Sequence, residues 1–76
     1  MFDRITFDPQ IMGGRACIRG LRMTVSMVVN LVANGMTTEA ILKEYPDLEP
    51  EDIRQALQYA ASLAREEVHS FPEKRI

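Results

Sequence analysis

A single cysteine, Cys17, in a chain of 76 residues excludes the internal disulfide that domains of this size often rely on. A domain this small buries only about 60–65% of the surface of its unfolded chain, so its one hydrophobic core is marginal. With one cysteine and one histidine, His69, the chain lacks the four Cys or His ligands of a structural zinc site. Association with another chain is the remaining means of stabilisation, and we predict a homodimer or a higher homo-oligomer.

The start of the sequence and its apolar stretches indicate the compartment. The chain begins with Met1, Phe2 and Asp3 and lacks the basic and apolar regions of a secretory signal peptide. The longest apolar stretch, residues 27–33, is interrupted by Asn30 and is too short to cross a bilayer. One free cysteine and five methionines suit a reducing environment. We therefore expect a bacterial, cytoplasmic protein that does not associate with a membrane.

Apolar residues at helical spacing predict a first helix from residue 24 onward. The stripe at i, i+3, i+4 and i+7 consists of Val25, Val28, Val29 and Val32. Thr24 or Ser26 is suited to cap its start, and Gly35 ends it. Valine has a low intrinsic helix propensity, so packing against other elements must hold this helix together.

Two further helices follow the first one. Thr38 is a good N-cap for the second, and Pro46 ends it because the residue before a proline avoids the α region. Pro50 is suited to the first position of the third helix, where Leu48 and Ile53 form a hydrophobic staple. Pro72 marks the outer limit of this helix. The apolar stripe of the third helix comprises Ile53, Ala56, Leu57, Ala60 and Ala64, extended by Leu63 and Val68.

The first part of the chain has a different pattern. Residues 5–7 and 16–19 are short β-prone runs, and Asp8-Pro9 and Gly13-Gly14 are turn signals between them. Gly20 then separates a third extended run, residues 21–25. Because an isolated hairpin is marginal in water, these strands must lie on the helices or pair with a second chain.

These patterns predict one mainly α domain over residues 1–76. Its helix-turn-helix-like core of three helices spans residues 24–68, since a tight turn at residues 45–49 joins the second helix to the third. Short strands or extended segments precede this core in residues 1–23, and a flexible tail follows in residues 69–76.

Charge is distributed unevenly over the chain. The net charge is −2, but residues 1–22 carry +2 and residues 23–76 carry −4. A basic end opposite an acidic end favours oriented association with a partner.

The sequence offers little for catalysis. Cys17 and His69 lie at opposite ends of the chain, and no nucleophile stands beside a base. Gly13-Gly14-Arg15 lacks the full pattern of a phosphate-binding loop. We predict a protein that is not an enzyme and that takes no cofactor, metal or small-molecule substrate.

A DNA-binding role is one alternative that the helix-turn-helix outline leaves open. A recognition helix presents its first residues to the major groove, and here these include Glu49, Glu51 and Asp52, which phosphates repel. A dimer joined through the N-terminal strands would instead use its arginines. The candidate DNA-binding residues are Arg4, Arg15, Arg19, Arg22 and Arg54.

A family resemblance rests on motifs in order along residues 4–64. They comprise Arg4-Ile5-Thr6, Asp8-Pro9, Gly13-Gly14-Arg15-Ala16-Cys17-Ile18-Arg19-Gly20, Arg22-Met23-Thr24-Val25, Gly35-Met36, Ile41, Tyr45-Pro46-Asp47-Leu48 and Asp52-Ile53-Arg54-Gln55-Ala56-Leu57. In these motifs the chain resembles the domain-of-unknown-function family 433. The resemblance implies a helix-turn-helix or homeodomain-like fold and a role similar to that of antitoxins encoded beside a PIN-like ribonuclease toxin.

The chain departs from the family pattern at four positions. Members commonly have lysine and proline at Arg15 and Ala16, threonine at Leu21, and serine or threonine at Glu49. The positive charge at residue 15 is kept, whereas the cap of the third helix is replaced by an acidic residue.

Our leading hypothesis is an antitoxin-like protein that inhibits a ribonuclease toxin. The resemblance implies that the toxin holds metal with clustered carboxylates, and an arginine that pairs with such carboxylates displaces the metal. Arg19 and Arg22 are the first candidates for that role, and Arg15 is the third. The candidate partner-binding residues are Gly13, Gly14, Arg15, Arg19, Gly20, Arg22 and Phe71, the last with Ile76 as a second contact.

A third alternative is an interaction module whose partner is not a toxin. Such a module would leave a large apolar patch exposed after folding. Met23, Met27 and Met36 are candidates for that patch, because methionine adapts to varied surfaces.

Overall fold

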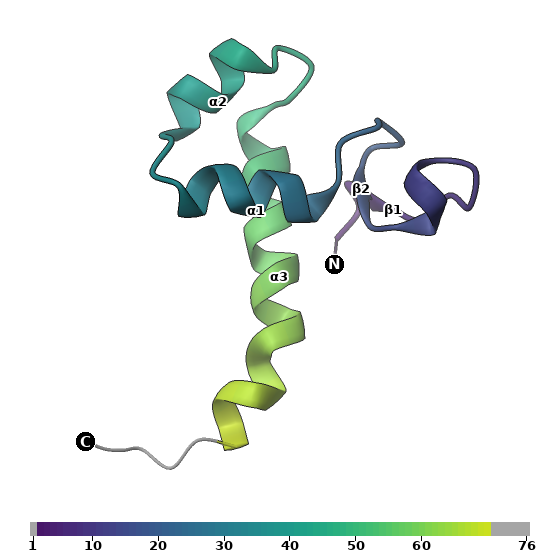
Figure 1. Ribbon diagram of the computed structural model, residues 1–76, viewed down its shortest axis with the longest axis vertical. Coiled ribbons are helices and arrows are strands. Elements are labelled where there is room, and N and C mark those ends of the chain that lie inside the picture. The colour runs from purple at the N-terminus through teal and green to yellow at the C-terminus, as the bar shows by residue number, and fades with distance from the viewer. Residues whose placement is uncertain (1, 71–76) are drawn as a thin grey trace.

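A computed structural model describes residues 2–70, with side chains described up to residue 64. The elements in chain order are β1 (Ile5–Thr6), the 3-10 helix η1 (Met12–Gly14), β2 (Cys17–Ile18), α1 (Val25–Ala33), α2 (Thr38–Glu44) and α3 (Pro50–Ser70). In Figure 1, α1 crosses the upper half of α3, α2 lies near the first turns of α3, and the strands stand beyond the start of α1. This arrangement confirms the predicted mainly α fold with three helices behind short N-terminal strands.

The first helix begins and ends as predicted. Thr24 is its N-cap, and the Oγ1 atom of this residue accepts a hydrogen bond of 3.1 Å from the backbone N–H of Met27. Past the helix end, Gly35 has a φ of +92°, in the left-handed region that side chains disfavour. Val25 and Val28 of the valine stripe are buried, so packing holds this valine-rich helix in place.

The N-cap of the second helix lies one residue before its predicted position. Its N-cap is Thr37 and not Thr38, because Thr37 is the residue with extended backbone, and its Oγ1 atom accepts the N–H of Ala40. Thr38 is already inside the helix. The helix ends at Glu44, and Tyr45 leaves the helical conformation before Pro46, as the proline predicts.

The third helix starts at Pro50, as expected from a proline at the first helical position. Leu48 before it and Ile53 inside it are both buried in the same core, which confirms the predicted staple. Within the described residues, none of the helices combines the length and hydrophobicity that a membrane span requires.

The N-terminal strands pair with each other and pack on the helices. β1 and β2 are antiparallel, with Ile5 opposite Ile18 and Thr6 opposite Cys17. Cys17 also bridges to Thr24, so the predicted third extended run lies beside β2. Ile5 and Ile18 both belong to the core that the helices share. The expectation that this small sheet rests on the helices is therefore confirmed.

The core is small. In the part of the chain that the structure describes, nine apolar residues are buried. They are Ile5, Cys17, Ile18, Val25, Val28, Ile41, Leu48, Ile53 and Ala56. All of them precede residue 57, and the later turns of α3 extend away from the body (Figure 1).

Candidate protein-binding site

A cluster of four charged side chains fixes the N-terminal segment to the start of α3. We call it the Asp52 cluster, and it comprises Arg4, Arg19, Glu49 and Asp52. The side chain of Asp52 is fully buried, and both of its oxygens accept hydrogen bonds from guanidinium groups. Arg4 contributes one bond of 2.8 Å, and Arg19 contributes bonds of 3.0 and 2.9 Å from Nε and Nη2. The buried carboxylate is therefore paired on two sides, as burial of a charge requires.

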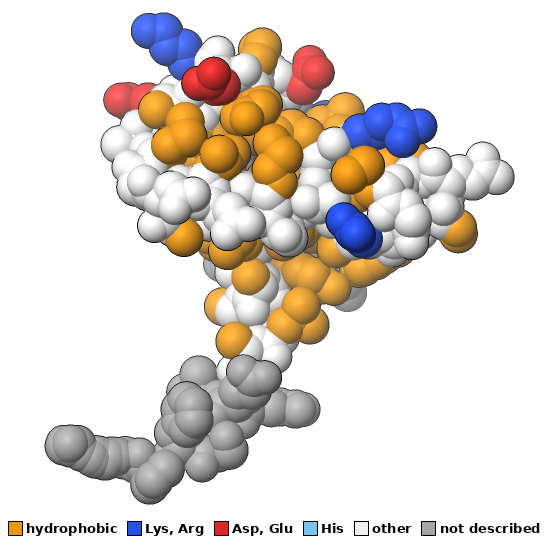
Figure 2. Space-filling model, in the orientation of Figure 1, with side chains coloured by type: hydrophobic (Ala, Val, Ile, Leu, Met, Phe, Trp, Pro, Cys, Tyr) orange, Lys and Arg blue, Asp and Glu red, His pale blue; other side chains and the backbone are white. Residues whose placement is uncertain are grey.

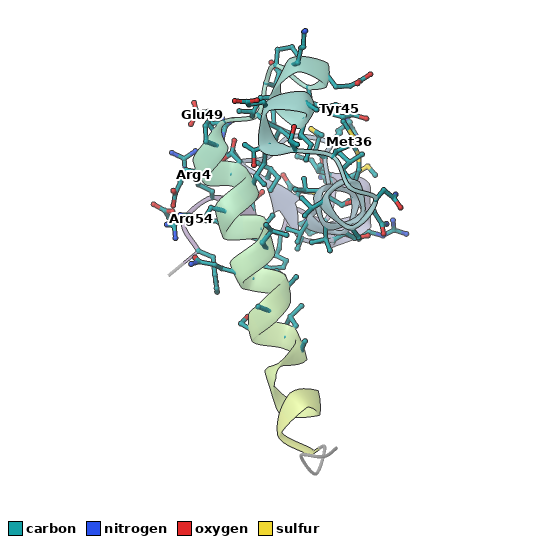
Figure 3. All side chains as sticks on the ribbon, turned by 90° about the vertical axis from the view of Figure 1, so that its left-hand side faces the viewer. Arg4, Met36, Tyr45, Glu49 and Arg54 are labelled. Atoms are coloured by element: carbon teal, nitrogen blue, oxygen red, sulfur yellow. The ribbon has the colours of Figure 1, made fainter. Side chains whose placement is uncertain are left out.

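The same carboxylate also caps α3. The backbone N–H of Glu49 donates to Oδ2 of Asp52 at 2.8 Å, which is the reciprocal half of a capping box. Glu49 stands where the family commonly has serine or threonine, and its side chain instead accepts a hydrogen bond of 2.7 Å from Arg4. Figure 3 shows Arg4 and Glu49 on the same side of the first turns of α3.

Electrostatics keep Asp52 ionised. Burial acts to raise the pKa of this carboxyl, but hydrogen bonds from Arg19 and Arg4 outweigh that effect and lower the pKa below its ordinary value. The pKa of Arg19 is raised in turn by its hydrogen bonds to Asp52.

The turn after β2 is held in an unusual backbone conformation. Arg19 and Gly20 have φ values of +44° and +73°, and the N–H of Leu21 closes the turn by donating to the carbonyl of Ile18 at 2.7 Å. Positive φ is uncommon for arginine, but here both ends of Arg19 are fixed. Its N–H donates to the carbonyl of Arg4, and its guanidinium donates to the carbonyl of Asp47 as well as to Asp52.

The structure separates the predicted arginines into two groups. Arg4 and Arg19 are paired in the Asp52 cluster, and Arg54 pairs with Glu51 one turn earlier on α3. Arg15 and Arg22 are exposed, and neither forms an ion pair with the carboxylates in the described part of the chain.

The remaining candidates lie near Arg15 or outside the described residues. Gly13 and Gly14 form the turn before Arg15, with φ values of +68° and +84°, so the predicted glycine corners are present. Phe71 and Ile76 lie outside the described residues, as does the side chain of His69. Among the side chains that the structure describes, no group of three His, Cys, Asp or Glu is placed to hold a metal ion.

An open apolar groove is the second feature of the site, and the sequence patterns did not reveal it. We call it the α1–α3 groove, and its volume is about 510 Å³. It is lined by Phe7, Arg15, Ala16, Thr24, Val25, Ser26, Val29, Asn30, Tyr59, Ala60 and Leu63. Phe7 and Leu63 are 57% and 65% exposed, and together with the other apolar lining they form a continuous apolar surface.

Contacts between aromatic rings form part of the groove wall. The rings of Tyr59 and Phe2 are nearly perpendicular, with centroids 5.5 Å apart, and the ring of Tyr59 lies 6.1 Å from that of Phe7. Such pairs add to the energy of simple apolar burial. Arg15 is the one charged side chain among the lining residues. The open shape and mostly apolar lining suit contact with an apolar surface of another molecule.

Comparison with known proteins identifies the family. The profile of the family described as "Protein of unknown function (DUF433)" matches residues 5–60. The chain belongs to the DUF433 family. The chain is also similar to the uncharacterized protein y4eO of Sinorhizobium fredii, with 41% identity over 56 residues. That match covers 74% of this chain but only 25% of the relative.

The fold of this DUF433 member also matches a solved structure. A crystal structure of a DUF433 member protein from Anabaena variabilis is similar with a TM-score of 0.73 and 30% identity. The match covers 88% of this chain and 65% of that chain. The chain therefore spans about a quarter of the curated relative and less than two thirds of the solved one.

Proposed function

We propose that this DUF433 member is an antitoxin-like binding protein that neutralises a PIN-like ribonuclease by presenting Arg15 and Arg22 to carboxylates of the enzyme. The observation that carries this proposal is the division of the arginines into paired and unpaired groups. Arg4, Arg19 and Arg54 already satisfy carboxylates of their own chain. Arg15 and Arg22 are exposed and remain available for a partner.

The position of the two arginines supports this role. Arg15 lies two residues before β2, and Arg22 lies in the segment after it, two residues past Gly20. The Asp52 cluster fixes the turn at Arg19, three residues before Arg22, and the backbone N–H of Arg15 donates to the carbonyl of Met12, so both arginines extend from an ordered backbone. Presenting charged groups on an ordered backbone lowers the entropic cost of binding.

The charge of the surface also supports an acidic partner. Figure 2 shows basic side chains without acidic neighbours at the end of the molecule formed by the N-terminal segment, whereas the Asp and Glu side chains on this face gather over α2, where a basic side chain also lies. Arginine forms two parallel hydrogen bonds with a carboxylate, which makes it well suited to a cluster of metal-binding acids.

This proposal changes the role that we assign to Arg19. The sequence alone made Arg19 a first candidate for contact with the toxin. In the structure its Nε and Nη2 atoms are occupied by Asp52 and by the carbonyl of Asp47. We now assign Arg19 to positioning the turn after β2, and Arg15 joins Arg22 as a contacting residue.

Co-expression with the product of the adjacent reading frame tests the proposal. We expect the two proteins to purify together and the complex to cleave single-stranded RNA more slowly than the ribonuclease alone. Replacing both arginines, Arg15→Ala with Arg22→Ala, should weaken inhibition by about 10-fold to 100-fold, since two charge-assisted contacts are lost. The control Lys43→Ala removes an exposed cation from α2 and should leave inhibition intact. Separate elution of the two proteins, or full inhibition by the double variant, would refute the proposal.

The wild type and the double variant also distinguish the antitoxin-like role from the DNA-binding alternative. A gel shift with DNA from upstream of the gene, measured at two salt concentrations, detects phosphate contacts by their salt dependence. A shift that disappears at high salt and in the double variant, without any inhibition of the ribonuclease, would replace our proposal with a DNA-binding regulator.

A further inference from the structure

We propose that a second copy of this chain covers the α1–α3 groove, giving a twofold homodimer in which the exposed face of α3 from each protomer packs against the groove of the other. The size of the chain predicts only that a dimer forms, whereas the structure assigns a surface to it. The inference does not depend on the proposed ribonuclease partner, and where the second copy covers Arg15 in the groove, Arg22 is the arginine that stays exposed for that partner.

The first argument comes from the exposed face of α3. We call this face the α3 ridge, and it consists of Leu57, Ala60, Ala61, Leu63 and Ala64. Leu57 is 37% exposed, and Leu63 is 65% exposed. Figure 2 shows hydrophobic side chains along the part of α3 that projects from the body. Amphipathic helices normally bury such a stripe against another element, and the small alanines allow a second helix to approach closely.

The second argument is that the ridge and the groove share residues. Ala60 and Leu63 belong to the ridge and also line the groove, beside Val25 and Val29 of α1. An isologous dimer requires one patch that is complementary to itself. A convex helix face next to a concave apolar groove meets this requirement, because each protomer supplies both halves of the contact.

The third argument concerns charge. Arg15 is the one charged residue that lines the groove, and the ridge has none. Two copies can therefore meet without bringing several like charges together, which would oppose self-association. A groove built for an acidic or basic partner would show more charge around its walls.

The fourth argument is energetic. The described chain buries nine apolar residues in its own core, and the groove lies directly beside that core, since Val25 belongs to both. Covering Phe7, Tyr59 and Leu63 with a second copy would extend the core across the interface. Domains of this size commonly gain the stability they lack through association.

The molar mass in solution tests the inference. Light scattering or sedimentation equilibrium on the full chain should give about twice 8.6 kDa at micromolar concentration. Leu63→Glu places a charge on the ridge and should raise the dissociation constant by about 30-fold or more. The matched control Gln58→Glu adds the same charge to an exposed position on the opposite side of the same helix, and should remain dimeric.

A second variant separates loss of the dimer from loss of the fold. Ser26→Glu introduces a carboxylate on the α1 wall of the groove, in the first turn of α1, where a negative charge favours the helix. It should therefore keep or raise helicity by circular dichroism while weakening the dimer. In a sample of mixed isotope labelling, we also expect an intermolecular contact between the Tyr59 ring and the Leu63 methyl groups.

Three results would overturn the inference. The first is a wild-type chain that stays monomeric at high micromolar concentration. The second is a dimer whose dissociation constant is the same for Leu63→Glu and Gln58→Glu, because that dimer uses another face. The third is a monomer that dimerises only when a ribonuclease is added, since the groove would then belong to a different protein.

Discussion

The two ends of α3 meet the rest of the molecule in opposite ways. Its first turn carries Asp52, which is fully buried and which two arginines and a backbone N–H satisfy. Its later turns carry Leu57 and Leu63, which the described chain leaves 37% and 65% exposed. One end of the helix therefore holds the fold together, whereas the other offers a surface for association.

Removing the carboxylate at the first end should produce the largest effect. Asp52→Ala leaves Arg4 and Arg19 without their partner and removes the cap from the N–H of Glu49. We expect the free energy of unfolding to fall by about 3 kcal/mol, near the low end for a broken buried pair because the arginines can regain water. Urea unfolding measures this value.

The neighbouring carboxylate provides the control. Glu51→Ala breaks the pair with Arg54 on the surface of the same turn, and exposed pairs contribute little to stability. If both variants unfold at the same urea concentration, the Asp52 cluster does not hold the fold.

Low pH should reduce the contribution of Asp52 to the free energy of unfolding. In the folded protein the pKa of Asp52 lies below its ordinary value of 3.8, so the unfolded chain binds protons more readily than the folded one. The stabilising contribution is complete above about pH 5 and is lost as the pH falls through 3.8 and then through the lower folded pKa. Asp52→Asn should flatten this part of the profile. An unchanged slope in unfolding experiments at about pH 7, 4 and 3 would contradict the assignment.

A rise in protein concentration should raise the melting temperature through contacts of the α3 ridge. If the α3 ridge pairs two chains, every tenfold rise in concentration adds about 1.4 kcal/mol to the free energy of dissociating and unfolding a dimer. The melting temperature of the wild type should rise accordingly in calorimetry, whereas that of Leu63→Glu should stay constant at concentrations below its raised dissociation constant. Parallel behaviour of the two proteins would show that Leu63 is not at the interface.

We expect the smallest effect for Leu63→Glu on the free energy of unfolding of the separated protomer. At a concentration low enough to separate the protomers, Leu63→Glu should change the free energy of unfolding by no more than about 0.5 kcal/mol, because its side chain is 65% exposed. A loss as large as that of Asp52→Ala would mean that the later turns of α3 also support the monomer fold.

Local sequence signals predicted the elements well. Prolines at positions 46 and 50 fixed the end of α2 and the start of α3, because they act through their own backbone geometry. The cap of α2 was placed one residue late, since Thr37 and Thr38 are chemically identical and only the backbone conformation distinguishes them.

Long-range features could not be predicted in the same way. In the sequence Asp52 stands out only as one of the carboxylates at the start of the third helix, yet its partners lie 33 and 48 residues away. No periodicity encodes such a pairing. The α1–α3 groove combines the N-terminal segment, α1 and α3, so it becomes visible only when their relative positions are known. Likewise, the sequence marks five candidate arginines but does not tell which are already paired.

The contact between Arg4 and Asp52 also bears on how the chain folds as it is made. Arg4 emerges from the ribosome 48 residues before the carboxylate that fixes it. Helices depend on contacts close in sequence and form early, whereas contacts between distant residues must wait for the intervening chain. The segment with β1 and β2 is therefore made before α3 but docks after it, and until the first turns of α3 have formed the two strands remain available to other chains.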